Sequence, residues 1–175
     1  MINVVLYQPE KPQNTGNIMR TCVATNVHLH IIGPLTFTLD EKSLKRAGMD
    51  YIQELKYTYY NSLEEFFSLN KNINIYFITR YGNKSPDLVD FSNVSENVYV
   101  MFGRESTGIP HDLLRDNLDK CLRLPMVPSA RSLNLSNTVA IVVYEILRQQ
   151  NYYGLSTYEA IKGKDFLMTE VKEDE

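Results

Sequence analysis

The strongest constraint on the fold is an alternation of short apolar, β-branched runs with segments of helical pattern. The apolar runs occupy residues 2–7, 29–32, 73–79, 97–102 and 121–124, and each is followed by Gly, Pro or a polar residue. Continuous apolar runs are typical of strands buried on both faces, and their alternation with helices favours a parallel sheet. We therefore expect an α/β fold, a parallel sheet with helices on both faces.

Capping signals locate the expected helices. Residues 14–17 can start a helix through Ala24, and Asp40 or Ser43 can cap a short helix that ends at Gly48. Residues 62–69 form another predicted helix, and Pro110 suits the first position of a helix over 111–116. The segment 138–147 is ambiguous, because its β-branched residues favour a strand and its apolar spacing favours a helix. We predict a helix there.

Composition limits the classes of function. Residues 164–175 hold two Lys and five acidic residues, so the other 163 residues balance 16 basic against 16 acidic groups. Any RNA-binding patch must therefore be local. We expect one domain over residues 1–155 and a C-terminal extension over 156–175 that is a mobile acidic tail.

Cysteine and histidine are sparse. Cys22 and Cys121 form no CxxC pair, and His28, His30 and His111 lack the spacing of metal ligands. We expect neither a disulfide scaffold nor a bound metal. A signal peptide and an apolar run long enough to span a bilayer are both missing, so a cytoplasmic protein without a membrane partner is expected.

Three segments carry the candidate chemistry. In residues 14–20, Arg20 follows Gly16 by one helical turn and can clamp a phosphate or a carboxylate, although a solvated arginine behind capping asparagines explains it as well. Residues 103–110, GRESTGIP, lack the Lys-Ser/Thr of a P-loop and the spacing of a dinucleotide fingerprint, which argues against ATP and NAD. A plain turn is the alternative there.

The third segment, residues 124–137, packs two prolines, three serines, two asparagines and one arginine in front of the apolar segment 138–147. It is either a binding loop or a loop that ends in a helix cap. In parallel sheets ligands bind at the carboxyl ends of strands. Thr79, Gly103 and Leu124 each end a strand or follow one, so they predict one shared pocket.

Basic and aromatic side chains also cluster in sequence. Lys42, Lys45 and Arg46 share one predicted helical face, which suits either an RNA backbone track or a solvated charged face. The tyrosines of residues 57–60 are interpreted as packing or dimer surface.

Taken together, residues 14–20, 102–110 and 124–137 resemble the three ordered motifs of the SPOUT methyltransferases. Residues 4–9 and 29–32 make the chain similar to the small, TrmL-like tRNA 2′-O-methyltransferases of that class, which have no added RNA-binding domain. The resemblance covers about residues 1–150. It implies S-adenosylmethionine as methyl donor, S-adenosylhomocysteine as product, and no metal. It also implies a homodimer and a deep trefoil knot in the C-terminal part.

The implied reaction is methylation of the ribose 2′-hydroxyl of the wobble nucleotide, position 34, a cytidine or modified uridine in the tRNA anticodon stem-loop. The resemblance places the donor against Ile78, Gly103, Leu124 and Ser132, with Thr79, Met126 and Ala130 beside them. It assigns catalysis to Asn14, Arg20, Glu105 and Asn134. We expect further RNA contacts at Arg131, at Lys42 and Arg46 of the basic helical face, and at Tyr144 just beyond the third motif.

The role of Arg20 follows from its chemistry. Guanidinium is normally a donor only, so we expect Arg20 to hold a phosphate and orient the hydroxyl rather than to remove its proton. Glu105 is expected to orient Arg20 or to pair with Arg131. Residues 138–149 and the first-motif helix are expected at the dimer interface. Methylation of another tRNA position or of rRNA, and non-catalytic RNA binding, are the alternative functions.

Overall fold

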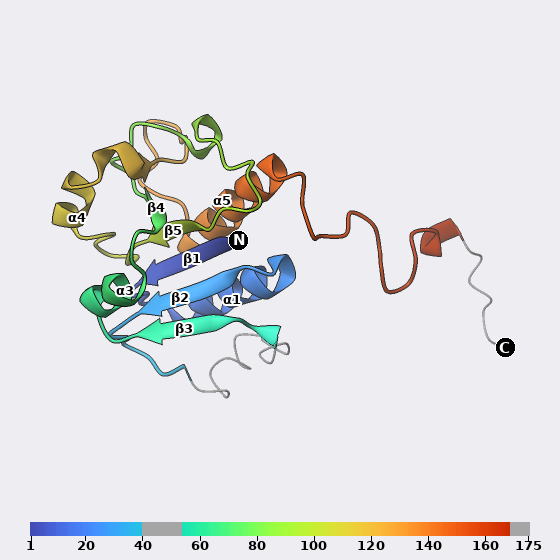
Figure 1. Ribbon diagram of the computed structural model, residues 1–175, viewed down its shortest axis with the longest axis horizontal. Helices are drawn as coiled ribbons and strands as arrows, with labels where there is room; N and C mark the ends of the chain where they lie inside the picture. The colour runs from blue at the N-terminus through green and yellow to red at the C-terminus, as the bar shows by residue number, and fades with distance from the viewer. Residues whose placement is uncertain (40–53, 169–175) are drawn as a thin grey trace.

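The computed structural model describes residues 1–39 and 54–168, and its body is a single parallel sheet (Figure 1). Six strands lie in the order β3-β2-β1-β5-β4-β6, and every neighbouring pair is parallel. The strands are β1 (Ile2–Tyr7), β2 (His28–Ile32), β3 (Tyr57–Tyr60), β4 (Asn74–Ile78), β5 (Val98–Phe102) and β6 (Cys121–Leu122).

Helices cover both faces of this sheet, as the sequence predicted. In residues 1–39 and 54–168 the α-helices are α1 (Pro12–Thr25), α3 (Leu63–Leu69), α4 (His111–Arg115) and α5 (Leu135–Gln149). Short 3-10 turns are η2 (Pro86–Leu88), η3 (Leu118–Lys120) and η4 (Phe166–Met168). Helices α1 and α5 pack side by side on one face, and α3 and α4 cover the other.

The alternation of side chains along each strand divides the core into two layers. Val4 and Leu6 of β1 face α1 and α5, where they pack in one cluster with Val143. Val5, between them, faces the opposite layer and packs with Phe66 of α3. Burial of each such side chain contributes roughly 1.5–3 kcal/mol, so both faces of the sheet stabilise the fold.

Several element boundaries differ from the sequence prediction. Helix α1 begins at Pro12 rather than at Asn14, because proline suits the first turn and needs no hydrogen-bond partner for its nitrogen. Helix α5 is confirmed as a helix but begins at Leu135, and Pro110 precedes α4 as its N-cap. Strand β3 was not predicted. The predicted helix at 40–48 lies outside the described residues.

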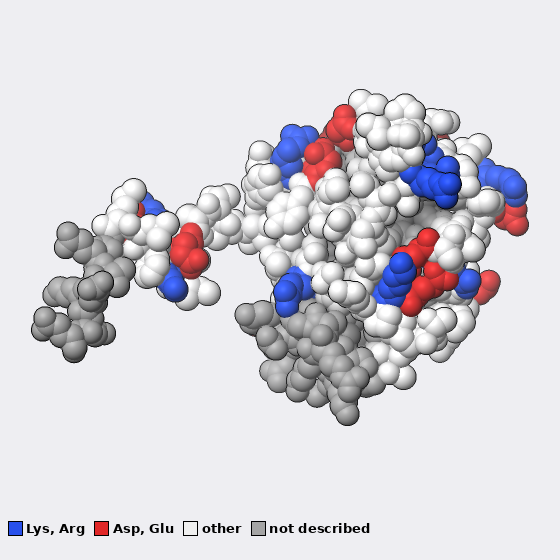
Figure 2. All heavy atoms as spheres, turned by 180° about the vertical axis from the view of Figure 1, so that it is seen from behind, with Lys and Arg blue, Asp and Glu red and all other residues white. Residues whose placement is uncertain are grey.

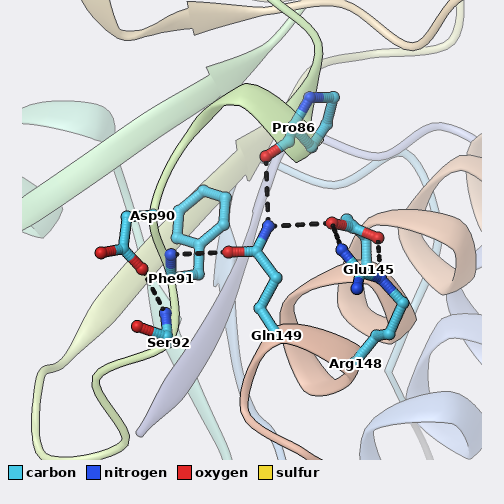
Figure 3. A network of polar contacts seen from close by, with 7 residues as sticks. All are labelled: Pro86, Asp90, Phe91, Ser92, Glu145, Arg148 and Gln149. Carbon is cyan, nitrogen blue, oxygen red and sulfur yellow. Dashed lines mark hydrogen bonds and ion pairs between the residues drawn. The ribbon is translucent and has the colours of Figure 1, made fainter.

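The C-terminal end of α5 holds the segment between β4 and β5 (Figure 3). The Gln149 Oε1 atom accepts a hydrogen bond of 2.8 Å from the Phe91 backbone N–H, and Gln149 Nε2 donates to the carbonyl oxygen of Pro86. Gln149 Nε2 also donates to Glu145, whose carboxylate forms two hydrogen bonds of 2.9 Å with Arg148. Residues 86–91 are therefore fixed to α5.

A polar cluster lies inside the layer beneath α3. His30 is 5% exposed, and its ring nitrogens lie 2.9 Å from the Tyr60 hydroxyl and 3.2 Å from Asn3 Oδ1. The neighbouring His28 ring stacks on His30 with centroids 4.5 Å apart.

Residues 156–168 are exposed and extend away from the body (Figure 1). Among the helices of the described part of the chain, none is long and apolar enough to cross a membrane.

Candidate functional site

A cavity of about 500 Å³ opens at the carboxyl ends of β4, β5 and β6. The loops that follow these strands supply most of its wall, and the start of α1 closes one side. Figure 2 shows a hollow on the surface with blue Lys and Arg atoms around it and red Asp and Glu atoms beside some of them. The predicted convergence of Thr79, Gly103 and Leu124 is confirmed, because all three line this cavity.

The loop after β5 is a tight turn that depends on two glycines. The backbones of Arg104 and Gly108 exchange hydrogen bonds of 3.2 and 3.0 Å. A Cβ atom added to Gly103 would lie 2.1 Å from the carbonyl carbon of Gly108, and Gly108 itself has φ +75°. Both positions therefore require glycine, one for close approach and one for its backbone conformation.

The loop after β4 lies directly against β6. The Thr79 N–H donates to the Leu122 carbonyl at 2.9 Å, and the Arg123 N–H donates to the Lys84 carbonyl at 2.8 Å. A Cβ atom on Gly82 would lie 2.5 Å from the backbone of Leu122. These two walls of the cavity are consequently held together by backbone contacts.

A chain of hydrogen bonds joins the three candidate motifs. Asn134 Nδ2 donates to Asn14 Oδ1 at 3.0 Å, and Asn14 Nδ2 donates to Glu105 Oε1 at 2.9 Å. Glu105 also accepts from the backbone N–H groups of Glu10 and Lys11 at 2.9 and 3.3 Å. The sequence suggested Arg20 or Arg131 as partner of Glu105, whereas the partners seen here are Asn14 and the backbone.

The direction of this amide chain is fixed at both ends. Asn134 caps α5, because its Oδ1 accepts from the backbone N–H groups of Ser136 and Asn137 at 2.9 and 3.3 Å. Its Nδ2 must then face Asn14, which presents its oxygen to Asn134 and its Nδ2 to the Glu105 carboxylate. The helix cap is thus Asn134, four residues before the start of the helix predicted at 138–147.

A second carboxylate reinforces the same corner. Glu10 accepts hydrogen bonds from the Ser106 backbone N–H at 2.9 Å and from its hydroxyl at 2.7 Å. These bonds, with the nearby charges of Arg104 and Lys11, lower the pKa of Glu10. Glu10 and Glu105 together tie the loop after β1 to the loop after β5.

The residues predicted to bind the methyl donor line the cavity, with one exception. Ala130 does not contribute to the wall, and its N–H closes a turn to the Val127 carbonyl instead. Those that line the cavity are Ile78, Thr79, Gly103, Leu124, Met126 and Ser132.

The predicted substrate-side residues divide into two groups. Asn14, Glu105, Asn134 and Arg131 line the cavity. Arg20 on α1 and Tyr144 on α5 are exposed and do not line the cavity. Lys42 and Arg46 lie outside the described residues.

Sequence reasoning missed several charged and aromatic residues of the cavity. Four of them stand outside the three motifs, and Arg104 lies inside the second motif but was given no role. Arg104 stacks over the Tyr7 ring, 5.6 Å from its centroid, and its buried Nε finds no hydrogen-bond partner among the described residues. The missed residues are Lys11, Arg80, Tyr81, Arg104 and Arg123.

No cluster of His, Cys, Asp and Glu in the described ranges could hold a metal ion. Residues 1–144 match the model of the SpoU rRNA Methylase family. The chain belongs to this family. Because the match covers the strands, the cavity and most of α5, it includes all three segments that the amide chain connects.

Relatives of this SpoU family member align over nearly their whole length. A protein of Geobacillus stearothermophilus is 54% identical over 155 residues, which cover 89% of this chain and 99% of the relative. A tRNA (cytidine(34)-2′-O)-methyltransferase of Escherichia coli strain K12 is 42% identical over 156 residues, 88% of this chain and 97% of the enzyme. A solved structure concerning 2′-OH methylation of C/U34 on tRNA matches with a TM-score of 0.79 and 37% identity, over 87% of this chain and 97% of that one.

Proposed function

We propose that this SpoU family enzyme methylates the ribose 2′-hydroxyl of the wobble nucleotide, position 34, a cytidine or modified uridine, in tRNA. The observation that carries the proposal is the similarity, over 88% of the chain, to a tRNA (cytidine(34)-2′-O)-methyltransferase. The amide chain from Glu105 to Asn134 supports it, because it assembles three distant segments around one cavity. An enzyme of tRNA is expected in the cytoplasm.

The donor proposed for the cavity is S-adenosylmethionine, which supplies an electrophilic methyl group and leaves as S-adenosylhomocysteine. A volume of about 500 Å³ suits a cofactor of this size. The walls also fit its chemistry, since apolar Ile78, Leu124 and Met126 stand beside polar Thr79 and Ser132. The donor carries no phosphate, which agrees with a turn at 103–108 that lacks the Lys-Ser/Thr of a P-loop.

The substrate side is assigned to Asn14, Glu105, Asn134 and Arg20. Transfer forms the bond between the methyl carbon and the ribose oxygen, breaks the carbon–sulfur bond, and releases the hydroxyl proton. Glu105 holds Asn14, and Asn14 holds Asn134, so the amides stay fixed at the cavity wall while the hydroxyl is positioned. Arg20 is assigned to an adjacent phosphate.

A homodimer is part of this proposal. Arg20 lies outside the cavity of its own subunit, and the outer face of α5 exposes Ile141 and Tyr144 beside α1. One subunit can then help to bind the anticodon stem-loop while the other holds the donor. A monomer at micromolar concentration by light scattering would count against it.

We further propose a knotted path for the C-terminal part of a methyltransferase unit that spans residues 1–155. An acidic extension over 156–175 follows it, and residues 169–175 of that extension lie outside the described residues. Two sets of contacts support the knot. Residues 121–123 lie against the loop after β4, and Gln149 binds residues 86–91 on the far side of that loop.

The decisive experiment is transfer of tritiated methyl groups from S-adenosylmethionine to total tRNA, followed by nucleoside mapping. We expect label on the 2′-oxygen of nucleotide 34, and little label with Arg20→Ala. Arg115→Ala, an exposed arginine that pairs with Asp112, is the matched control and should behave as wild type. Absence of label, or full activity of Arg20→Ala, would overturn the assignment, and label elsewhere would favour another tRNA position or rRNA.

A further inference from the structure

The rim of the cavity carries a tyrosine on a turn that the fold holds in place. Tyr81 is 56% exposed and follows β4. Its N–H donates to Thr79 Oγ1 at 3.3 Å, and Arg123 Nη1 donates to the Arg80 carbonyl at 2.8 Å. The close contact of Gly82 with β6 prevents this turn from shifting alone. The backbone that carries the ring is therefore held at the rim of the cavity.

The neighbours of the ring are polar or cationic groups. The Arg80 guanidinium lies over one face of the ring, 5.8 Å from its centroid, and the His111 ring makes an edge contact with it, with centroids 5.3 Å apart and planes at 88°. A large aromatic side chain that is more than half exposed contributes little to the core. Its open surface suits another planar π system, since stacking needs only a free ring face.

Charge around Tyr81 differs from that of the whole chain. The net charge of the protein is -3, whereas the cavity lining contains five basic residues and one acidic residue, Glu105. A planar ring within a positive rim matches a single-stranded nucleic acid, which offers stacked bases and phosphates together. The basic residues are Lys11, Arg80, Arg104, Arg123 and Arg131.

We infer that Tyr81 is a stacking platform for a nucleobase of the substrate RNA that flanks the methylated nucleotide, and that Arg80 and Arg123 attract the adjoining phosphates. The inference rests on the proposed function and names a contact that holds the RNA substrate. Anticodon loops present unpaired bases, and sequence-tolerant stacking on an aromatic ring is a common way to hold such bases.

Steady-state kinetics of Tyr81→Ala and Tyr81→Phe test the platform. Loss of one stacked base costs about 5- to 100-fold, so we expect Tyr81→Ala to raise the KM for tRNA by about tenfold while kcat at saturating tRNA and the Kd for S-adenosylmethionine stay unchanged. Tyr81→Phe keeps the ring and should stay within about twofold of wild type. Tyr158→Ala, a tyrosine 65% exposed on the C-terminal extension, is the matched control.

The RNA side completes the test. An abasic site is placed in turn at each position beside nucleotide 34 of an anticodon stem-loop. At the stacked position it should weaken binding to wild type as much as Tyr81→Ala does, and should weaken binding to Tyr81→Ala no further.

Three results would overturn the platform. These are an unchanged KM for tRNA in Tyr81→Ala, a raised Kd for S-adenosylmethionine instead, or independent losses from Tyr81→Ala and the abasic site at every position. Wild-type protein that methylates no tRNA would refute the proposed function, which is a separate outcome.

Discussion

His30 makes the stability of the protein depend on pH, and its contacts fix which ring nitrogen carries the proton. Asn3 Nδ2 donates to the carbonyl oxygens of Met1 and Val98, so Asn3 turns its Oδ1 toward His30 Nε2. Nε2 must therefore carry the hydrogen, and Nδ1 accepts from the Tyr60 hydroxyl. Protonation of Nδ1 removes that acceptor and places a charge among buried rings.

The size of the effect follows from the pKa. Burial, and then the charge of His28, lower the pKa of His30 from 6.5 to about 4. Below pH 6.5 this histidine is protonated in the unfolded chain, whereas in the folded protein it stays neutral down to about pH 4. The contribution of His30 to stability is therefore complete above pH 6.5 and declines as the pH falls from 6.5 to about 4. At about 1.4 kcal/mol per pKa unit, roughly 2 kcal/mol should be lost by pH 5.

Urea unfolding between pH 7.5 and 5 measures this loss while most carboxylates stay ionised. We expect the fall in the free energy of unfolding to be about 2 kcal/mol smaller for His30→Gln than for wild type, because the glutamine side chain does not titrate. His28, whose pKa burial also lowers, still contributes in both proteins. His111→Gln, at an exposed histidine, should keep the wild-type dependence. Equal slopes for wild type and His30→Gln would refute the reasoning.

Three further substitutions probe the site and its supports. Asn134→Asp keeps the oxygen that caps α5 but loses the N–H that donates to Asn14, so methyl transfer should fall at least tenfold while the melting temperature changes little. Asn134→Ala loses the cap as well, and its free energy of unfolding in urea should also fall by about 1 kcal/mol. Gly103→Ala has no space for its Cβ, so calorimetry should show loss of S-adenosylmethionine binding together with lower stability. Gln149→Ala leaves the Phe91 N–H without its acceptor and should cost about 1–2 kcal/mol in the same unfolding assay.

The sheet was predictable because its central strands have a clear sequence pattern. Residues 2–7 and 97–102 are uninterrupted apolar runs, which only a strand buried on both faces explains easily. Strand β3 lacks this signal, since it is an edge strand in which Tyr57 and Tyr59 are exposed and Tyr60 is buried. The start of α1 was misplaced because Lys11 forms no side-chain cap that the sequence could reveal.

The candidate site was predictable only in part. The motifs identified Asn14, Glu105 and Asn134, but their mutual hydrogen bonds join residues 91 and 120 positions apart, and no local pattern specifies such pairing. Arg80 and Tyr81 were missed for another reason. They occupy a loop whose sequence is ordinary, and they reach the cavity only because β6 packs against that loop.

The amide chain also has a consequence for folding kinetics. Its ends come from the loop after β5 and from the cap of α5, and its middle member, Asn14, comes from α1. The strand pairing between β1 and β5 also spans about 95 residues. Non-local contacts of this kind form slowly, because long loops must close before any contact stabilises them. During refolding, the helical circular dichroism signal should consequently return before the cavity forms. The rate at which activity returns would then report the last step, in which α5 docks and its cap contacts α1.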